Sequence, residues 1–298
     1  MDKYGKQRPI DDDKTDNSGF LKRAREHQSK FRYEFLKLSD YDEYGNYLTI
    51  NDAQNGYNFY SGFDIFNAVK KYSDFNKNLY QNMLRSEHIP FNIFIPLENN
   101  KKYFTEVFNE ILDGKIKTIN SLKIEYAPQP KENYLNDRTS FDVYIEYTQN
   151  DNKNGIIGIE IKYTERGYKI GEKEKNEIDN CESIYYKITN ESNTYRDEII
   201  SKLKEDDYRQ IWRNHLLGES ILLKNTDKFQ YFTSITFYPQ NNSHFQKVSK
   251  EYKEFLKDEY KDKCLFITYE KLIELLYKYC PDSNYKKWIE YLNKRYII

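Results

Sequence analysis

The chain has 298 residues, with 47 Lys and Arg against 48 Asp and Glu and a formal net charge of −1. This balance excludes the overall basic footprint of a histone-like nucleic-acid binder. Aromatic residues make up 17% of the chain, and that much buriable surface excludes a disordered protein. No apolar run predicts a membrane span or a secretory signal, and the three cysteines lack CxxC spacing, which excludes a zinc site or a disulfide framework. A cytoplasmic protein without a membrane partner is expected.

Helical spacing dominates the first part of the chain. Residues 1–20 are acidic and polar and are expected to form a flexible leader. Turn-forming residues predict a loop or a short hairpin at 41–62. Apolar residues at helical intervals predict helices at residues 20–38, 73–88 and 105–114. A short apolar run between two prolines, residues 90–96, is left without an assignment.

Five runs of alternating or β-branched residues predict strands, at residues 121–128, 139–148, 155–164, 229–239 and 264–270. The sequence NDNKNG is expected to close a hairpin between the second and third strands. Further helices are predicted at residues 208–224, 248–260, 271–280 and 285–296. Three consecutive strands flanked by helices predict an α/β fold with a central mixed sheet. Because no linker divides the chain, residues 21–298 are expected to form one domain with a charged insertion at about 165–205.

Two neighbouring predicted strands carry a pattern of charged residues that points to chemistry. In SFDVYIEY and GIIGIEIKYT, apolar positions alternate with Asp142 on the first strand and with Glu160 and Lys162 on the second. A closed hairpin places both carboxylates on one face, where they repel each other unless a cation lies between them. Oxygen ligands of this kind suit Mg²⁺, and the Ile161 carbonyl is a further candidate ligand. Lys162 is a candidate for orienting the attacking water and neutralising a phosphate.

The same pattern has a plainer interpretation. A solvated strand face with alternating charges produces Asp…Glu-x-Lys by chance in a chain with 32% charged residues. Two features favour a site over this alternative. Both carboxylates lie in strongly apolar strands, and Gly158 is expected to leave room for the backbone of a ligand.

The order of elements, with Asp on the second strand and Glu-x-Lys on the third, resembles the PD-(D/E)XK nuclease superfamily. The blocks NMLRSEHIPFNIFIPL, SFDVYIEY, GIEIKYTE and YRQIWRNHLL look like a restriction-endonuclease-like bacterial branch, across roughly residues 20–270. The resemblance implies a core of order αβββαβ with additional terminal helices. It also implies an Mg²⁺-dependent phosphodiesterase acting on DNA, with Mn²⁺ as an alternative ion. Asp142 and Glu160 are then metal ligands and Lys162 is the catalytic lysine, while Phe141 stands in place of the proline.

Three further positions are candidates on the same resemblance. Members of the superfamily often carry an acidic or amide residue on the first core helix, which Glu87 or Asn82 can supply, Glu87 as a further metal ligand. Gln210 matches a polar residue that related nucleases direct at the active site, and a surface position is the alternative. Arg213 lies on nearly the same helix face, where it can contact a phosphate or pair with Asp206 or Asp207.

Two classes of function remain open at this point. The first is a DNA endonuclease of restriction or phage-defence type. The second is a nucleic-acid-binding or assembly protein that keeps the fold without catalysis. A repair or recombination nuclease that recognises DNA structure is a variant of the first. A homodimer and any protein partner are left open.

Overall fold

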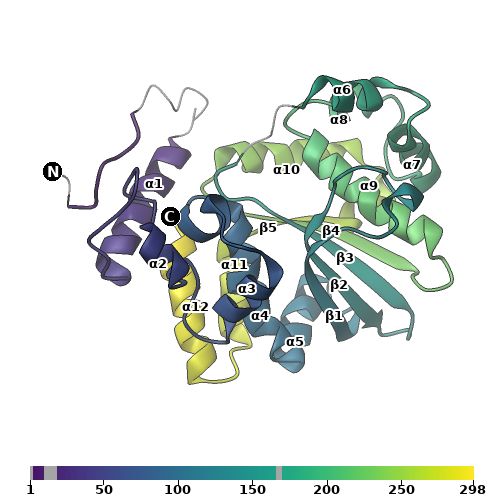
Figure 1. Ribbon diagram of the computed structural model, residues 1–298. Coiled ribbons are helices and arrows are strands. Elements are labelled where there is room, and N and C mark those ends of the chain that lie inside the picture. Colours follow the sequence, from purple (N-terminus) through teal and green to yellow (C-terminus); the bar gives the residue numbers. More distant parts are fainter. Residues whose placement is uncertain (1–2, 10–18, 166–169) are drawn as a thin grey trace.

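Five strands form one mixed sheet in the order β1-β2-β3-β4-β5 (Figure 1). The computed structural model describes residues 3–9, 19–165 and 170–298. The strands are β1 (Ile116–Tyr126), β2 (Phe141–Gln149), β3 (Asn154–Ile161), β4 (Tyr231–Tyr238) and β5 (Cys264–Thr268). The first three are antiparallel neighbours, whereas β4 runs parallel to β3 and β5 runs parallel to β4. The predicted α/β class with a mixed sheet is confirmed.

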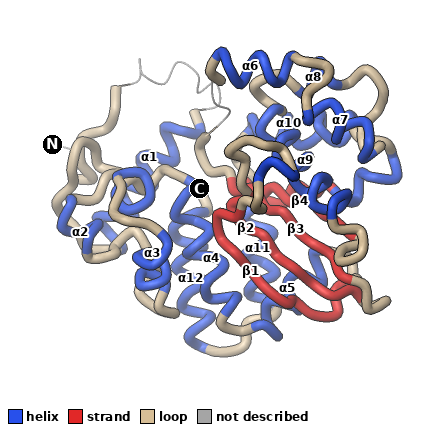
Figure 2. The backbone as a smooth tube through the Cα atoms, turned by 45° about the vertical axis from the view of Figure 1, so that its right-hand side comes forward, coloured by secondary structure: helices blue, strands red, loops and turns tan. Residues whose placement is uncertain are grey.

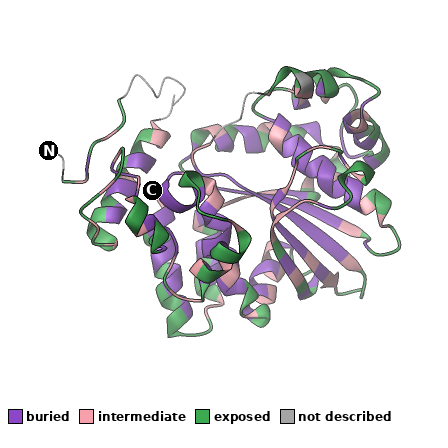
Figure 3. Cartoon of the chain, in the orientation of Figure 1, coloured by how far each residue is buried: buried purple, intermediate pink, exposed green. Residues whose placement is uncertain are grey.

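Helices cover both faces of the sheet, so its central strands are buried on both sides (Figures 1 and 3). In β3, Ile156, Ile157, Ile159 and Ile161 are all buried. One face packs against α4 (Ile89–Glu98), α5 (Lys101–Ile111), α11 (Tyr269–Lys278) and α12 (Ser283–Tyr296). The other face packs against α7 (Ile184–Ser192), α9 (Arg209–Lys224) and α10 (Ser243–Phe255). The nearly continuous apolar sequence of β3 is the expected result of this double cover.

The segment that precedes the sheet packs beside α12 (Figure 2). It contains α1 (Phe20–Lys30), a π-helical turn (Phe31–Phe35), α2 (Ile50–Gln54) and α3 (Ile65–Tyr72). Gln28 and Phe31 contact Arg295 and Tyr291 of α12, through a hydrogen bond of 2.7 Å and an edge-on ring contact. Residues 1–20 were expected to form a flexible leader. Within this segment, residues 3–9 contact the folded chain, because Arg32 donates a hydrogen bond to the Tyr4 carbonyl at 2.9 Å. The rest of the leader up to residue 18 lies outside the described residues.

The structure differs from the sequence prediction between residues 41 and 98. The helix predicted at 73–88 is replaced by a π-helical turn (Lys77–Gln81) and a 3₁₀ turn (Ser86–His88). The reason is that backbone groups near Met83 and Gln81 bond with residues 46–48 instead of continuing a helix. The unassigned run between the prolines is α4, which is buried on almost every side and therefore has no amphipathic pattern to detect.

The charged insertion is helical where it is described. It contains α6 (Glu172–Asp179), α7 and α8 (Ile200–Leu203), which lie above α9 in Figure 1. Residues 166–169, which begin the insertion, lie outside the described residues. Among the helices of the described ranges, none is long and apolar enough to cross a membrane.

Candidate active site

Three acidic residues lie in one row across the first three strands. The pair Val143 and Ile159 ends the β2–β3 register, so the next step along both strands brings Asp142 opposite Glu160. On the other side of β2, the flanking pairs Ile124–Val143 and Tyr126–Phe141 bring Glu125 opposite Asp142. Residues opposite each other in an antiparallel pair share a face of the sheet. The strand register therefore gathers the three carboxylates on one face.

Asp142 is held at the point where β2 and β3 separate. Its Oδ2 accepts a hydrogen bond of 2.5 Å from the backbone N–H of Ile161. Because the N–H and the carbonyl of a strand residue point to the same side, the Ile161 carbonyl is directed toward Asp142 as well. Lys162, the next residue, bonds instead through its N–H to the Phe237 carbonyl of β4 at 2.8 Å.

Glu160 is the centre of a dense set of contacts. Its Oε1 lies 2.5 Å from Lys162 Nζ and accepts a hydrogen bond of 2.6 Å from Gln210 Nε2. Its Oε2 accepts a hydrogen bond from the Asn214 side-chain amide. Gln210 and Asn214 are four residues apart on α9, so they project from the same face of that helix. Both charged side chains are nearly buried, Lys162 at 5% and Glu160 at 7% exposure. A paired and hydrogen-bonded arrangement is what makes such burial tolerable.

Burial and neighbouring negative charge raise the pKa of two carboxyl groups in this row, Asp142 and Glu125. Burial, together with the charges of Glu160 and Glu125, raises the pKa of Asp142 well above its usual range. Burial and the charge of Glu160 also raise the pKa of Glu125 to about 7. Carboxyl groups of this kind hold their protons unless positive charge is supplied. The site is therefore short of positive charge, even with Lys162 in place.

The donor set fits a divalent cation with oxygen ligands. Among the residues that the structure describes, no three His, Cys, Asp or Glu side chains converge tightly enough to hold a metal ion by themselves. Asp142, Glu160 and the Ile161 carbonyl could supply part of a coordination shell. Glu160 Oε1 already has two partners, but Glu160 Oε2 and the Asp142 oxygens retain lone pairs beyond their present hydrogen bonds. Mg²⁺ is commonly bound by one or two carboxylates plus water and phosphate oxygens.

A cavity of about 310 Å³ opens beside these groups. It is lined by Arg138, Thr139, Ser140, Asp142, Glu160, Glu174, Gln210, Arg213 and Asn214. Its walls come from the loop before β2, the end of β3, α6 and α9. Of the predicted site residues, Asp142, Glu160 and Gln210 line this cavity.

Not every candidate residue reaches this cavity. Glu87 lies in the 3₁₀ turn before α4 and pairs with Arg85 at 2.8 Å, although its charge adds to the raised pKa of Glu125. Asn82 is buried in a turn, where it donates a hydrogen bond to the Tyr47 hydroxyl. Neither residue lines the cavity. Both residues were placed on a helix predicted at 73–88. Turns replace that helix, so both residues lie before α4.

Arg213 lines the cavity, but both terminal nitrogens of its guanidinium are engaged with protein carboxylates. It pairs with Asp137 at 2.7 Å and also with Glu174, and its side chain is only 7% exposed. The suggested partners Asp206 and Asp207 are not used, since Asp206 pairs with Arg209. Arg213 thus connects α9 to the loop before β2 and to α6, and its contact with a phosphate stays a prediction.

The space beside Gly158 is filled, contrary to the expectation from the sequence. A Cβ atom at this position would lie 2.2 Å from a ring carbon of Phe141. Glycine is required here because the Phe141 ring lies over the strand and occupies the space that was expected for a ligand backbone. As a result, Phe141 packs in the core on the α9 side of the sheet, whereas Val143 and Ile145 pack in the core on the opposite side.

Two residues of the site were not found from the sequence. Asn214 had an available signal, because its spacing of four from Gln210 on a predicted helix places both amides together. Glu125 had none, because its position depends on the β1–β2 register. Its φ of 52° is also a left-handed conformation that few side chains adopt.

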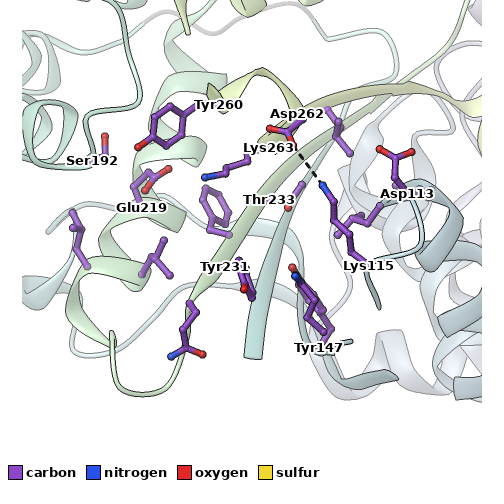
Figure 4. Close-up of a pocket in the computed structure, with 18 of the residues that line it drawn as sticks. Asp113, Lys115, Tyr147, Ser192, Glu219, Tyr231, Thr233, Tyr260, Asp262 and Lys263 are labelled. Carbon is purple, nitrogen blue, oxygen red and sulfur yellow. Dashed lines mark hydrogen bonds and ion pairs between the residues drawn. The ribbon is translucent and has the colours of Figure 1, made fainter. Parts of the chain in front are cut away.

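A second cavity, of about 370 Å³, lies at the other end of the central strands (Figure 4). Lys115 pairs with Asp262 across its rim at 3.5 Å, and Glu219 and Lys263 also line it. None of the sequence-predicted site residues line this cavity. The chemistry predicted from the sequence therefore belongs to the smaller cavity beside Asp142.

Comparison with known proteins agrees with the class that the fold and the site define. The strand order, with acidic residues on β2 and β3 and a lysine two residues further on, is that of a restriction-endonuclease-like fold. A family model described as the PD-(D/E)XK nuclease superfamily matches residues 13–298, nearly the whole chain. The chain therefore belongs to the PD-(D/E)XK nuclease superfamily, whose members are generally nucleases. Searches of the curated proteins and of the solved structures return no match.

Proposed function

We propose that this protein is an Mg²⁺-dependent endonuclease that hydrolyses phosphodiester bonds in DNA. The observation that carries the proposal is the convergence of Asp142, Glu160 and Lys162 beside a cavity open to substrate, with Glu160 held by Gln210. The alternative interpretation of the same sequence pattern, a solvated strand face, requires these charged side chains to be exposed. Glu160 and Lys162 are buried instead.

The proposed ligands are Asp142, Glu160 and the Ile161 carbonyl, and Mn²⁺ is expected to substitute for Mg²⁺. When bound, the cation supplies activation of a water molecule and stabilisation of charge on the phosphate. Asp142 is fixed by the Ile161 N–H and Glu160 by two side-chain amides. The protein thereby holds both carboxylates in place before substrate arrives, which is what electrostatic preorganisation requires.

Lys162 is assigned the role of orienting the nucleophilic water and compensating negative charge. The ion pair with Glu160 Oε1, at 2.5 Å, holds Lys162 Nζ beside the row of carboxylates. A lysine in this place presents a compact charge with three donors, which an arginine does not reproduce. On the resemblance of its sequence blocks to a restriction-endonuclease-like branch, we assign the enzyme to restriction or phage defence.

A plasmid-nicking assay tests the proposal. The wild-type protein is expected to convert supercoiled DNA to nicked or linear forms with Mg²⁺ or Mn²⁺, and EDTA should abolish the conversion. Glu160→Gln should lose at least 100-fold in rate, in line with the loss of a charge-stabilising group. Glu146→Gln is the matched control, because Glu146 lies on β2 but pairs with Lys228 outside the cavity. Cleavage that persists in EDTA would contradict the metal assignment.

The same assay separates the alternatives. DNA binding without cleavage in any divalent ion would identify a binding or assembly protein that has the fold alone. Preferential cleavage of branched or gapped substrates over linear duplex would identify a repair or recombination nuclease.

A further inference from the structure

The cavity beside Asp142 and Glu160 is lined by two arginines with opposite surroundings. Arg213 is buried and ion-paired with Asp137 and Glu174. Arg138 is exposed and makes no hydrogen bond or ion pair with any residue in the described parts of the chain. Lys162, the nearby lysine, is already bound to Glu160. Arg138 therefore brings a full set of unused donors to a cavity whose other cations are engaged.

The backbone that carries Arg138 is anchored on both sides. Asp137 accepts hydrogen bonds of 2.8 Å from both the backbone N–H and the hydroxyl of Thr139. It also accepts a hydrogen bond of 2.6 Å from Tyr185 and pairs with Arg213. Four donors on one carboxylate fix this loop relative to α7 and α9. The Arg138 backbone is therefore fixed by its neighbours, while its side chain remains available. This arrangement is suited to binding a ligand.

Arg138 also faces a second cavity. This larger cavity of about 850 Å³ adjoins the first and shares Arg138, Glu174 and Arg213 with it. Its lining is of mixed charge, with four acidic residues beside Lys131, Arg138 and Arg213. Of the two arginines common to both cavities, Arg213 is already ion-paired and Arg138 is exposed. The planar guanidinium matches phosphate oxygens in a bidentate geometry.

We propose that Arg138 binds a backbone phosphate of the nucleic acid and thereby places the scissile phosphate against Asp142 and Glu160. The inference rests on the proposed nuclease function and adds a substrate-binding residue to it. Arg138 neutralises one phosphate charge, and the fixed loop before β2 sets the distance from that phosphate to the carboxylates.

Binding and cleavage are measured separately to test this role. Affinity for a fluorescent DNA duplex is measured by anisotropy in the Glu160→Gln background, with Ca²⁺ and at several salt concentrations. Loss of one phosphate contact should reduce the slope of log affinity against log salt by about 0.9. In this background Arg138→Ala should show that reduction and about tenfold weaker binding, whereas Arg138→Lys should keep the slope. With the cleaving enzyme, Arg138→Ala should raise KM, and Arg138→Lys should restore kcat/KM only in part.

Lys131→Ala is the matched control. Lys131 is an exposed cation in the same loop, but it lines the larger cavity and not the catalytic one. Its replacement should leave slope, KM and kcat unchanged. The thermal midpoints of all variants should equal that of their parent, since neither side chain makes an ion pair with the residues that the structure describes. An unchanged slope and KM in Arg138→Ala would overturn the proposal. Binding without cleavage by the wild type would instead refute the nuclease function while the slope still reports on Arg138, and a wild type that binds no DNA would overturn both.

Discussion

The carboxylate of Glu160 receives hydrogen bonds from two side-chain amides of α9 and an ion pair from Lys162. An amide donates without adding charge, so Gln210 and Asn214 orient the carboxylate while leaving its negative charge available. Residues that orient a metal ligand from behind commonly affect metal affinity strongly. The two amides are therefore expected to be positioning residues rather than catalytic ones.

Asn214→Ala is expected to lower Mg²⁺ affinity by roughly 10- to 100-fold, which is the usual effect of losing such a supporting contact. Asn214→Asp should be worse, because a further carboxylate would then face Glu160 directly. The measurement is the Mg²⁺ concentration that gives half-maximal cleavage, with isothermal calorimetry as the second readout. Gln210→Ala should behave like Asn214→Ala, and a rate that is low at saturating Mg²⁺ with unchanged metal affinity would contradict a positioning role.

Glu125 should make the metal-free protein less stable as the pH rises. Its pKa is raised from the ordinary value of 4.5 to about 7 in the folded state. Between these values the unfolded chain loses its proton while the folded chain keeps it, so the free energy of unfolding falls with increasing pH. Each pKa unit corresponds to about 1.4 kcal/mol, so the shift from 4.5 to about 7 sets an upper limit of about 3.5 kcal/mol on the loss of stability.

Urea unfolding in EDTA at pH 4.5 and pH 7.5 measures this effect. Glu125→Gln should reduce the stability difference between the two pH values, and Mg²⁺ should restore stability to the wild type more strongly at pH 7.5. The control is Glu146→Gln, which should leave the difference unchanged. The attribution of this pH dependence to the carboxylate row would be refuted by a wild-type free energy of unfolding that rises between pH 4.5 and pH 7.5, with the Glu125→Gln variant behaving identically.

The height of α9 above the sheet is set by a glycine. A Cβ at Gly218 would lie 1.9 Å from a ring carbon of Phe232 on β4. Glycine thus lets the helix approach closely enough for Gln210 and Asn214 to reach Glu160. Gly218→Ala should destabilise the fold by about 1–3 kcal/mol through overpacking.

Because it moves α9, Gly218→Ala should also slow cleavage. Phe232→Leu in the same chain should restore part of both stability and rate, since it removes the ring that the new methyl group meets. A double-mutant cycle by chemical denaturation measures the coupling, and additive effects would show that the two positions act independently.

The strands and α9 were predictable because their signals are local. Alternation and β-branching mark β1 to β5 in the sequence alone, and α9 has a regular apolar face. Helix α4 was not predicted, because a helix that is buried on all sides shows no hydrophobic periodicity. The π-helical turn at Lys77–Gln81 was not predicted either, since its hydrogen bonds depend on residues 46–48, about thirty positions earlier.

The same division applies to the site. Asp142, Glu160 and Lys162 were readable because one hairpin brings them together. Glu125 required the register of a third strand and a left-handed backbone. Arg138 could not be identified from the sequence for a different reason. It differs from Arg213 in having no partner within residues 3–9, 19–165 and 170–298, and only a folded structure reveals that.

Across the whole molecule, α12 joins the first helix to the helices beneath the sheet. Gln28 of α1 bonds to the Arg295 carbonyl, and Trp288 Nε1 donates to the Asn92 carbonyl of α4 at 2.7 Å. The Arg295 side chain is fully buried and bonds to the Asn58 carbonyl at 2.7 Å. These shared contacts predict that residues 21–298 unfold as one domain.

Chemical denaturation followed by tryptophan fluorescence and by far-ultraviolet circular dichroism tests this expectation. Both signals should give one coincident transition. Trp288→Phe should lower stability by about 1–3 kcal/mol, through the unsatisfied carbonyl and the lost volume. Two separate transitions, with the first confined to residues before β1, would show that the N-terminal segment is a separate unit.

The bond between Gln28 and Arg295 joins residues 267 positions apart. A ribosome synthesises the chain from its N-terminus at roughly 5–20 residues per second. At that rate the aromatic face around Phe31 is synthesised many seconds before Tyr291, the residue that covers it. During this interval the nascent chain exposes an apolar surface that α12 covers in the folded structure. Folding efficiency in the cell should therefore depend on holdase chaperones, and on how quickly translation reaches residue 296.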